Sequence, residues 1–216
     1  MHIWRKLIMT DLFKEMLEGD LFMQCDVVNR VAFRSLPKGF SLRLCRHNEI
    51  TTWKAIFAQG KYMDFVDSYY NKVYAPFEEE FFRRCLFVVD ECDKPIATSG
   101  IWRSYGMINT LLGFFVIPEY EGQGIGRGLL SEVMRNVDEP VYLHTHPTAN
   151  KAIKLYSDFG FKFVIDSTVG YRKNILEKAY LYLRELLSKK GYSDLPTIKA
   201  NPALLEAALL DEFAEF

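Results

Sequence analysis

Glycines occupy every second position of the stretch 122–128, which reads Gly-Gln-Gly-Ile-Gly-Arg-Gly. Because glycine has no Cβ, its backbone N–H group can turn toward a ligand in conformations that other residues avoid. The stretch follows the apolar run 108–117 and precedes residues 125–137, whose apolar side chains recur at helical spacing. The start of a helix carries a partial positive charge. The sequence therefore predicts a site for phosphate oxygens between a strand and a helix.

Two common phosphate-binding loops have a different glycine spacing. A Walker-type loop ends in Gly-Lys followed by Ser or Thr, and no lysine follows these glycines. A dinucleotide loop has Gly-x-Gly-x-x-Gly in the first strand–helix–strand unit, whereas these glycines alternate strictly and lie in mid-chain. The pattern argues against both loops.

The apolar periodicity predicts an α/β (α+β) protein with strands and helices in mixed order. Strands are expected at about 40–45, 85–90, 95–103, 108–117, 141–145 and 161–166, and helices at about 48–58, 61–74, 77–84, 125–137 and 148–159. The three strands between 85 and 117 have short connections, which favours an antiparallel meander. Gly160 is expected to end the helix before it.

Further helices are expected near both ends of the chain. The apolar spacing indicates them at 9–18, near 27–33, at 171–190 and after Asn201-Pro202, which resembles an N-cap followed by proline. We therefore predict a helical N-terminal extension at 1–38, an α/β domain at 39–168, and a helical C-terminal extension at 169–216. The C-terminal extension is expected to pack on the domain or to form a homodimer contact.

Two motifs in this order resemble a known family. The motif Val-x-Pro-x-Tyr-x-Gly-x-Gly-Ile-Gly-Arg-x-Leu at 116–129 resembles the GNAT superfamily of N-acetyltransferases, and so does Asn-x-Ala-x-x-Leu-Tyr-x-x-x-Gly-Phe at 150–161. The resemblance covers about 40–168. It implies an acyl-CoA N-acyltransferase-like fold, in which helices flank a mixed, mostly antiparallel central sheet.

The resemblance also implies which residues bind acetyl-CoA as a co-substrate. The strand before the loop would pair with the pantetheine arm through Val116 and Ile117, and a β-bulge near its end would open a slot. The loop N–H groups would hold the pyrophosphate, at Gly122, Gln123, Gly124, Ile125, Gly126 and Arg127. Glu121 stands where the family usually has Arg or Gln, so either the affinity for CoA is modest or Gln123 and Arg127 compensate. Asn150 is a further candidate for a contact with the arm.

The implied reaction is acetyl transfer to a primary amine by direct attack on the thioester. Tyr156 stands where the family often has a tyrosine beside the sulfur, and a phenol with a pKa of about 10 can protonate the leaving thiolate. Two alternatives are a non-catalytic CoA-binding sensor or scaffold on the same fold, and an interaction role of the terminal extensions.

Other polar residues have structural and functional interpretations. Glu78, Glu79 and Glu80 are either a solvated face or, with nearby tyrosines (Tyr69, Tyr70 and Tyr74), an attraction for a cationic amine. Glu119 and Glu121 are alternative bases. His144 and His146 are either solvated or capping residues or, because their strand borders the cleft in the resembling family, a general base or an acceptor contact. They lack an evident third ligand, so no metal site is predicted.

Composition narrows the expected partners. The chain has 216 residues and a formal net charge of −1, which argues against a general nucleic-acid partner. No segment reads as a signal peptide or a membrane span. The four cysteines have neither Cys-x-x-Cys nor zinc spacing. We therefore expect a cytoplasmic protein with reduced thiols.

Overall fold

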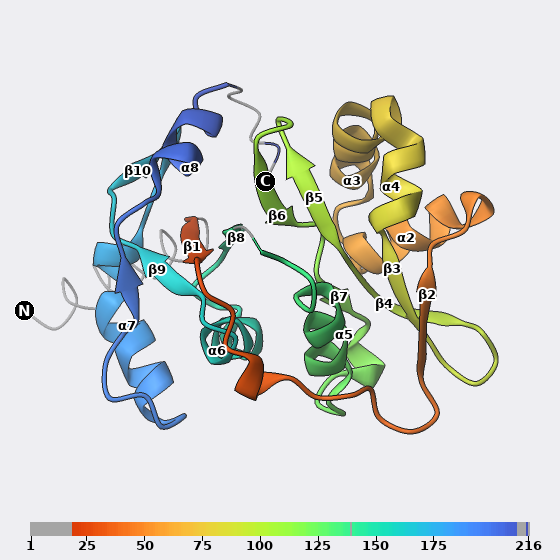
Figure 1. Ribbon diagram of the computed structural model, residues 1–216, viewed down its shortest axis with the longest axis horizontal. Helices are drawn as coiled ribbons and strands as arrows, with labels where there is room; N and C mark the ends of the chain where they lie inside the picture. The colour runs from red at the N-terminus through yellow and green to blue at the C-terminus, as the bar shows by residue number, and fades with distance from the viewer. Residues whose placement is uncertain (1–18, 139, 211–214, 216) are drawn as a thin grey trace, which may run out of the picture. The chain divides into compact units, whose positions relative to one another are not determined.

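The computed structural model describes residues 19–138, 140–210 and 215 (Figure 1). The described residues form two compact units. The loop-bearing unit comprises Arg30–Arg103 and Asn109–Asp138, and the terminal unit comprises Ser104–Ile108 together with the described residues up to Asn29 and from Pro140 onward. The helix expected at 9–18 lies outside the described residues.

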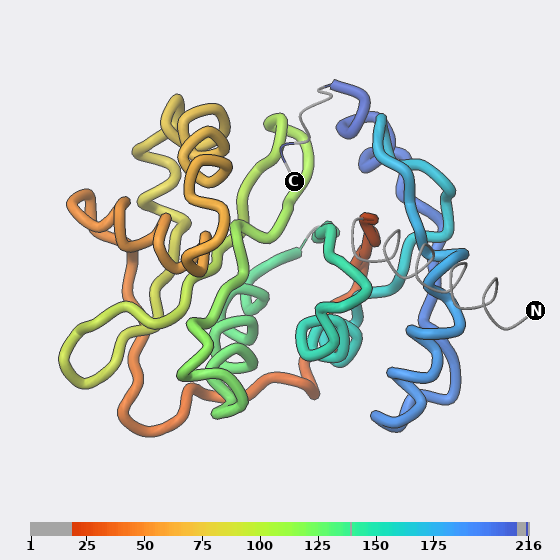
Figure 2. The backbone as a smooth tube through the Cα atoms, turned by 180° about the vertical axis from the view of Figure 1, so that it is seen from behind, coloured from red at the N-terminus to blue at the C-terminus, as the bar shows by residue number. Residues whose placement is uncertain are grey.

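The loop-bearing unit contains an antiparallel sheet with the strand order β2-β3-β4-β7 (β2 Ser41–Leu44, β3 Leu86–Val89, β4 Pro95–Ser99, β7 Phe115–Val116). Its α-helices are α2 Ile50–Ala58, α3 Met63–Tyr69, α4 Glu78–Arg84 and α5 Ile125–Val133. The unit also contains a π-helix, Tyr70–Tyr74. Its short 3-10 segments are Arg30–Ala32, His47–Glu49, Ala75–Phe77 and Pro118–Tyr120. In Figure 2 its long first segment runs unbroken from orange to yellow-green.

The two faces of this sheet pack against different helices, because successive strand residues point to opposite sides. Val88 and Ala97 are paired across β3 and β4, and Ala97 is paired with Val116 of β7. These side chains belong to one apolar cluster with Ile125 and Leu129 of α5. On the alternate positions, the Phe115 ring contacts Phe57 of α2 at 4.5 Å between ring centroids. The end of β7 therefore lies between α2 and α5.

Trp53 of α2 is the centre of an aromatic cluster in the loop-bearing unit. It is fully buried, and its indole contacts four rings at centroid distances of 5.1–5.8 Å, those of Phe57, Tyr70, Tyr74 and Phe81. Perpendicular and tilted ring pairs of this kind are favourable beyond the area they bury. Helices α2 and α4 and the π-helix are therefore held together largely by contacts between aromatic rings.

Each of the long strands expected at 95–103 and 108–117 is divided in two. A Cβ at Gly100, after β4, would lie 2.2 Å from the Arg84 carbonyl oxygen, so glycine allows a close backbone approach there. Gly113 has φ +36, and a Cβ on it would meet the Phe57 ring at 2.6 Å. These breaks separate β5 Ile101–Ser104 from β4, and β6 Ile108–Leu111 from β7. The interruption that we expected as a bulge is a break of the strand.

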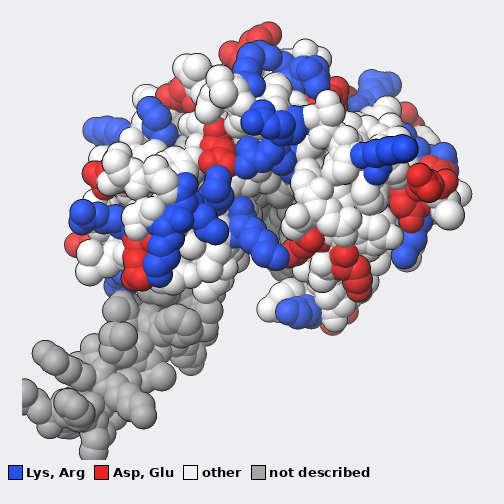
Figure 3. Space-filling view, turned by 90° about the horizontal axis from the view of Figure 1, so that it is seen from below, with Lys and Arg blue, Asp and Glu red and all other residues white. Residues whose placement is uncertain are grey.

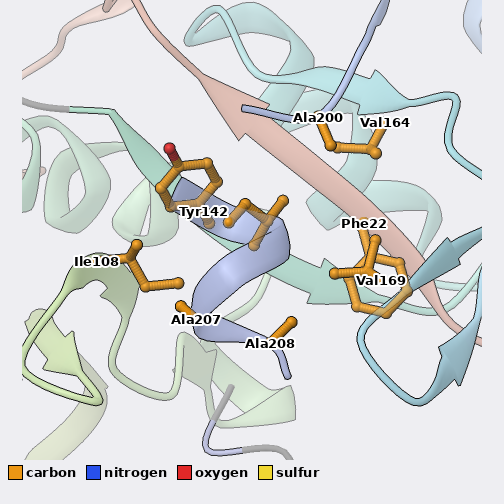
Figure 4. Close-up of a cluster of buried hydrophobic side chains, with 9 residues drawn as sticks. Phe22, Ile108, Tyr142, Val164, Val169, Ala200, Ala207 and Ala208 are labelled. Carbon is orange, nitrogen blue, oxygen red and sulfur yellow. The ribbon is translucent and has the colours of Figure 1, made fainter. Parts of the chain in front are cut away.

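The terminal unit contains a sheet in which β1 Leu21–Cys25 lies between β8 Val141–Thr145 and β9 Lys162–Val164, antiparallel to both. Strand β12 Thr197–Ile198 pairs in parallel with β9. Its α-helices are α6 Asn150–Asp158, α7 Leu176–Ser188 and α8 Pro202–Ala207, and β10 Thr168–Val169 and β11 Arg172–Lys173 form a hairpin. Figure 4 shows part of its core, in which Val164 lies next to Ala200 and Phe22 next to Val169, while Ala207 at the end of α8 belongs to the same cluster.

Two expectations for the terminal segments need correction. The described part of 1–38 is not helical: it contains strand β1 and a single 3-10 turn, Arg30–Ala32. All five side chains of β1 are buried, so both of its faces are covered and the polar alternation typical of a half-buried strand is missing. Strands β8 and β9 pair with its two edges. The segment 169–216 is only partly helical, since β11 and β12 belong to it and α7 begins at Leu176 rather than at 171.

Most local expectations in the middle of the chain are confirmed. Strand β8 has the expected bounds, and Gly160 follows α6 with φ +100. Asn201 caps α8 by accepting a hydrogen bond from the Ala203 N–H at 3.0 Å. Among the described residues, no helix combines the length and the apolar character needed to cross a membrane.

Candidate functional site

The predicted phosphate loop connects β7 to α5. The chain leaves β7 through the 3-10 turn Pro118–Tyr120 and reaches the helix at Gly124, which is its N-cap residue. Gly122 and Gly124 have φ +78 and +87, in the left-handed region that glycine adopts without strain. The first N–H groups of an α-helix have no acceptor within the helix. Gly124 has no side chain that could accept a hydrogen bond from them. Residues 121–124 are exposed, and the arrangement can therefore accept an anion.

The four glycines of the loop are present for different structural reasons. A Cβ at Gly122 would meet no atom within 4 Å, and one at Gly124 would meet only Pro37 at 3.7 Å. Both glycines are therefore required by backbone conformation and leave open space. In contrast, a Cβ at Gly128 would lie 2.7 Å from Leu36 Cδ2 and 3.0 Å from Leu36 Cα, so this glycine serves helix packing. Gly126 is the second residue of α5.

The polar side chains that were expected to help bind an anion have partners within the protein. Gln123 Nε2 donates to the Glu119 carbonyl at 3.2 Å, and Arg127 Nη1 donates to the Ala32 carbonyl at 3.3 Å. Glu121 is exposed. Each of the two residues expected to compensate for Glu121 thus has a backbone partner within the protein. Basic and acidic side chains both occur on the face shown in Figure 3. The backbone N–H groups at the start of α5 are therefore the groups of this loop that are best placed to accept an anion.

Val116 and Ile117, at the end of β7, use their backbone groups differently. The Ile117 N–H donates to the Ile96 carbonyl at 2.9 Å, so Ile117 faces β4. Because successive residues of an antiparallel strand face opposite sides, the backbone groups of Val116 point away from β4. β7 is the last strand of its sheet on that side. Of the two residues, Val116 is the one that presents its N–H and C=O toward the open edge.

The Val116 carbonyl accepts a hydrogen bond from Gln59 Nε2 at 3.2 Å. Gln59 is the C-cap residue of α2 and was not among the predicted site residues. Its position at the end of the predicted helix 48–58, before Gly60, indicated a helix end. Nothing in the local pattern indicated a contact with residue 116, since the two positions become neighbours only when α2 packs on β7.

Tyr156 and Asn150 lie on α6 in the terminal unit, whereas the loop residues and Val116 lie in the loop-bearing unit. Tyr156 is 6% exposed and packs against the Phe161 ring. Burial raises the pKa of its phenol, so the group stays protonated at neutral pH. Asn150 is exposed, and its Oδ1 accepts a hydrogen bond from the Tyr182 hydroxyl at 2.8 Å. Ala149 rather than Asn150 is the N-cap residue of α6.

The remaining candidates are largely engaged in structural contacts. Glu78 lies 3.3 Å from the Tyr70 hydroxyl, which donates to it, and Glu80 pairs with Arg84. His146 Nδ1 lies 3.2 Å from the Gly19 carbonyl oxygen. Within the described part of the chain, no three His, Cys, Asp or Glu side chains are grouped as a metal site would need.

Several solved structures are similar to the chain. An acetyltransferase of the GNAT family from Colwellia psychrerythraea has a TM-score of 0.52 and 16% identity, covering 67% of this chain and 52% of its own. A tandem GNAT protein from the clavulanic acid biosynthesis pathway has a TM-score of 0.50 and 13% identity, covering 66% and 49%. A GCN5-related N-acetyltransferase from Sphaerobacter thermophilus has a TM-score of 0.49 and 14% identity, covering 72% and 53%.

The chain thus spans about half the length of these solved structures. At these identities, the first two likenesses establish the fold. No curated protein sequence matches the chain significantly. The model of the acetyltransferase (GNAT) family matches residues 51–161, just over half of the chain, and this span includes the loop, α5, β8 and α6. The chain belongs to the acetyltransferase (GNAT) family.

Proposed function

We propose that the protein is an acetyl-CoA-dependent N-acetyltransferase that transfers the acetyl group to a primary amine. The observation that carries the proposal is the exposed start of α5. There Gly122 and Gly124 adopt positive φ without a packing requirement, and the first N–H groups of the helix have no acceptor within the helix itself. A pyrophosphate has the charge and the acceptor oxygens that such a helix start binds.

The remaining residues of the site would act on the other parts of the donor. The open edge at Val116 offers backbone groups to the amides of the pantetheine arm. Asn150 remains a proposed contact for this arm. The loop residues Gln123, Ile125, Gly126 and Arg127 would contribute their backbone N–H groups. The contacts of the loop use backbone groups and require no particular side chain, which is why glycine content distinguishes the loop.

In the proposed reaction, the nitrogen of a neutral amine attacks the thioester carbonyl carbon. A tetrahedral oxyanion forms, the carbon–sulfur bond breaks, and the thiolate leaves with a proton from an acid. We propose Tyr156 as this acid. Its phenol carries the proton at neutral pH, and burial, which raises its pKa, makes it a weaker acid than a free tyrosine. The attacking nitrogen loses its extra proton to solvent. Because the amine attacks the thioester directly, no covalent enzyme intermediate is needed.

A matched pair of variants tests the anion site. Asn and Asp are similar in shape and both tolerate the left-handed conformation of Gly124. Gly124→Asn and Gly124→Asp should therefore lose similar stability. Only Gly124→Asp adds a negative charge beside the pyrophosphate, and we expect it to weaken CoA binding at least about tenfold relative to Gly124→Asn. Calorimetric titration gives both affinities. Equal affinities would show that no anion binds at the start of α5.

Catalysis is tested separately from binding. A screen of amines with acetyl-CoA, read by thiol release, should find acceptors for the unmodified protein. Tyr156→Phe should keep CoA affinity and lower kcat about 10²- to 10⁴-fold, because it loses only the acidic hydroxyl. A protein that binds CoA but releases no thiol with any amine would instead be a sensor or a scaffold.

A further inference from the structure

The side chain of Gln59 occupies the open edge of β7. The Val116 carbonyl points away from β4, and Gln59 Nε2 donates to it at 3.2 Å. A primary amide N–H on a strand-edge carbonyl is the interaction that an amide group of an extended ligand would make at the same oxygen. Gln59 is exposed, so its side chain can leave this position for solvent without opening the core.

The backbone of Gln59 adds a second observation. Its φ is +46, a conformation that is unfavourable for side chains other than Gly, Asn and Asp. The backbone N–H of Gln59 already closes α2 by donating to the Ala55 carbonyl at 3.0 Å, and Gly60 follows with φ +73. A glycine at position 59 would end the helix with less strain. What glutamine adds at this position is the amide that reaches Val116.

We infer that Gln59 is an internal competitor for the acyl donor. In the free protein its amide occupies the Val116 carbonyl, and an amide N–H of the pantetheine arm displaces it when the donor binds. The inference rests on the proposed function, since it concerns the same strand edge. It makes Gln59 a residue that sets the affinity for the amide-bearing arm and leaves the affinity for the phosphate end unchanged.

Two ligands separate the arm from the phosphate end. CoA has both, whereas 3′-phosphoadenosine 5′-diphosphate has the same nucleotide and 5′-diphosphate without the arm. Gln59→Asn keeps the amide and tolerates the backbone conformation, but it is one methylene too short to reach Val116. Gln59→Gly removes the amide and relieves the strain, so it should fold at least as well as the unmodified protein. Thr51→Ala, at an exposed position of the same helix, is the control.

We expect Gln59→Asn and Gln59→Gly to bind CoA about two- to tenfold more tightly, which is the range for one net hydrogen bond. Affinity for the armless nucleotide and both affinities of Thr51→Ala should not change. If the unmodified protein binds CoA and the two variants bind it equally or more weakly, Gln59 only supports the fold, and the inference is wrong while the proposed function stands. An equal increase in affinity for CoA and for the armless nucleotide would also overturn the inference. If the unmodified protein binds neither ligand, the proposed function fails and the inference fails with it.

Discussion

The two units bury their cores by different means. In the loop-bearing unit, Trp53 contacts Phe57, Tyr70, Tyr74 and Phe81, which all lie within a short stretch of the chain. In the terminal unit, β1 pairs with β8 and β9, more than a hundred residues further along the chain. The aromatic cluster of the loop-bearing unit is built from contacts that are local in the chain, and the sheet of the terminal unit from non-local strand pairing.

This difference explains which elements periodicity could predict. Helix α2 was expected at 48–58 and spans Ile50–Ala58, because its amphipathic spacing is visible within the helix itself. Strand β1 was missed because it is central and buried on both faces, and its partners are distant in sequence. Local patterns contain the information for the first case only.

The largest expected effect is on the aromatic core of the loop-bearing unit. Trp53→Ala should lower the free energy of unfolding by about 3–5 kcal/mol, because it removes a fully buried indole and leaves a cavity. Urea unfolding measures the change. Trp53→Phe is the control: the buried indole Nε1 has no hydrogen-bond partner, so a phenyl ring loses volume but no hydrogen bond. If Trp53→Phe is as harmful as Trp53→Ala, ring packing does not dominate this core.

The next largest effect concerns a buried polar contact in the terminal unit. Asn174 Nδ2 donates to the Val164 and Asp166 carbonyls at 2.7 and 2.8 Å, and its Oδ1 accepts from the Leu176 N–H at 3.1 Å. Asn174→Ala leaves these groups unpaired, and we expect urea unfolding to show a loss of about 2–3 kcal/mol. Asn174→Asp keeps the acceptor and loses the donor, so it should also destabilise. An unchanged Asn174→Ala variant would show that β9 and α7 are held by apolar contacts alone.

Only the backbone features of the candidate site were predicted from the sequence. The glycine spacing predicted an anion loop before a helix, and the structure has Gly122 and Gly124 in the required conformation at the start of α5. The sequence did not distinguish these glycines from Gly128. Glycine is needed at position 128 because Leu36, a residue 92 positions earlier, packs closely against it. The contact of Gln59 with Val116 was also unpredictable, because it depends on how α2 packs.

A smaller and pH-dependent effect on stability is expected from an ion pair at the surface of the loop-bearing unit. Arg43 donates to both carboxylate oxygens of Glu49 at 2.7 and 2.8 Å, and this contact lowers the pKa of Glu49. A lowered pKa contributes stability above the unfolded pKa of about 4.3, and this stability disappears as the pH falls through the folded pKa. Glu49→Gln should cost about 1 kcal/mol at pH 7 and progressively less below pH 5. Urea unfolding across this range measures the difference, and a difference independent of pH would contradict the ion pair.

The smallest effect is a reactivity difference that reports on each unit without changing its stability. Cys92 is exposed, whereas Cys25 in the terminal unit and Cys45 and Cys85 in the loop-bearing unit are buried. Burial raises the pKa of Cys25 to about 12 and also raises that of Cys85, so neither forms a thiolate at pH 8. A thiol reagent should modify Cys92 at once.

The other three cysteines should react only when their unit opens. In Cys92→Ser, low urea concentrations and peptide mass spectrometry would show which buried thiol reacts first. Because non-local strand pairing must be lost before β1 is exposed, reaction of Cys25 measures opening of the terminal sheet, while Cys45 and Cys85 measure opening at β3. Equal rates at every urea concentration would mean that the two kinds of core open together. Rapid reaction of Cys25 without urea would show that β1 does not have the central, covered position on which the comparison depends.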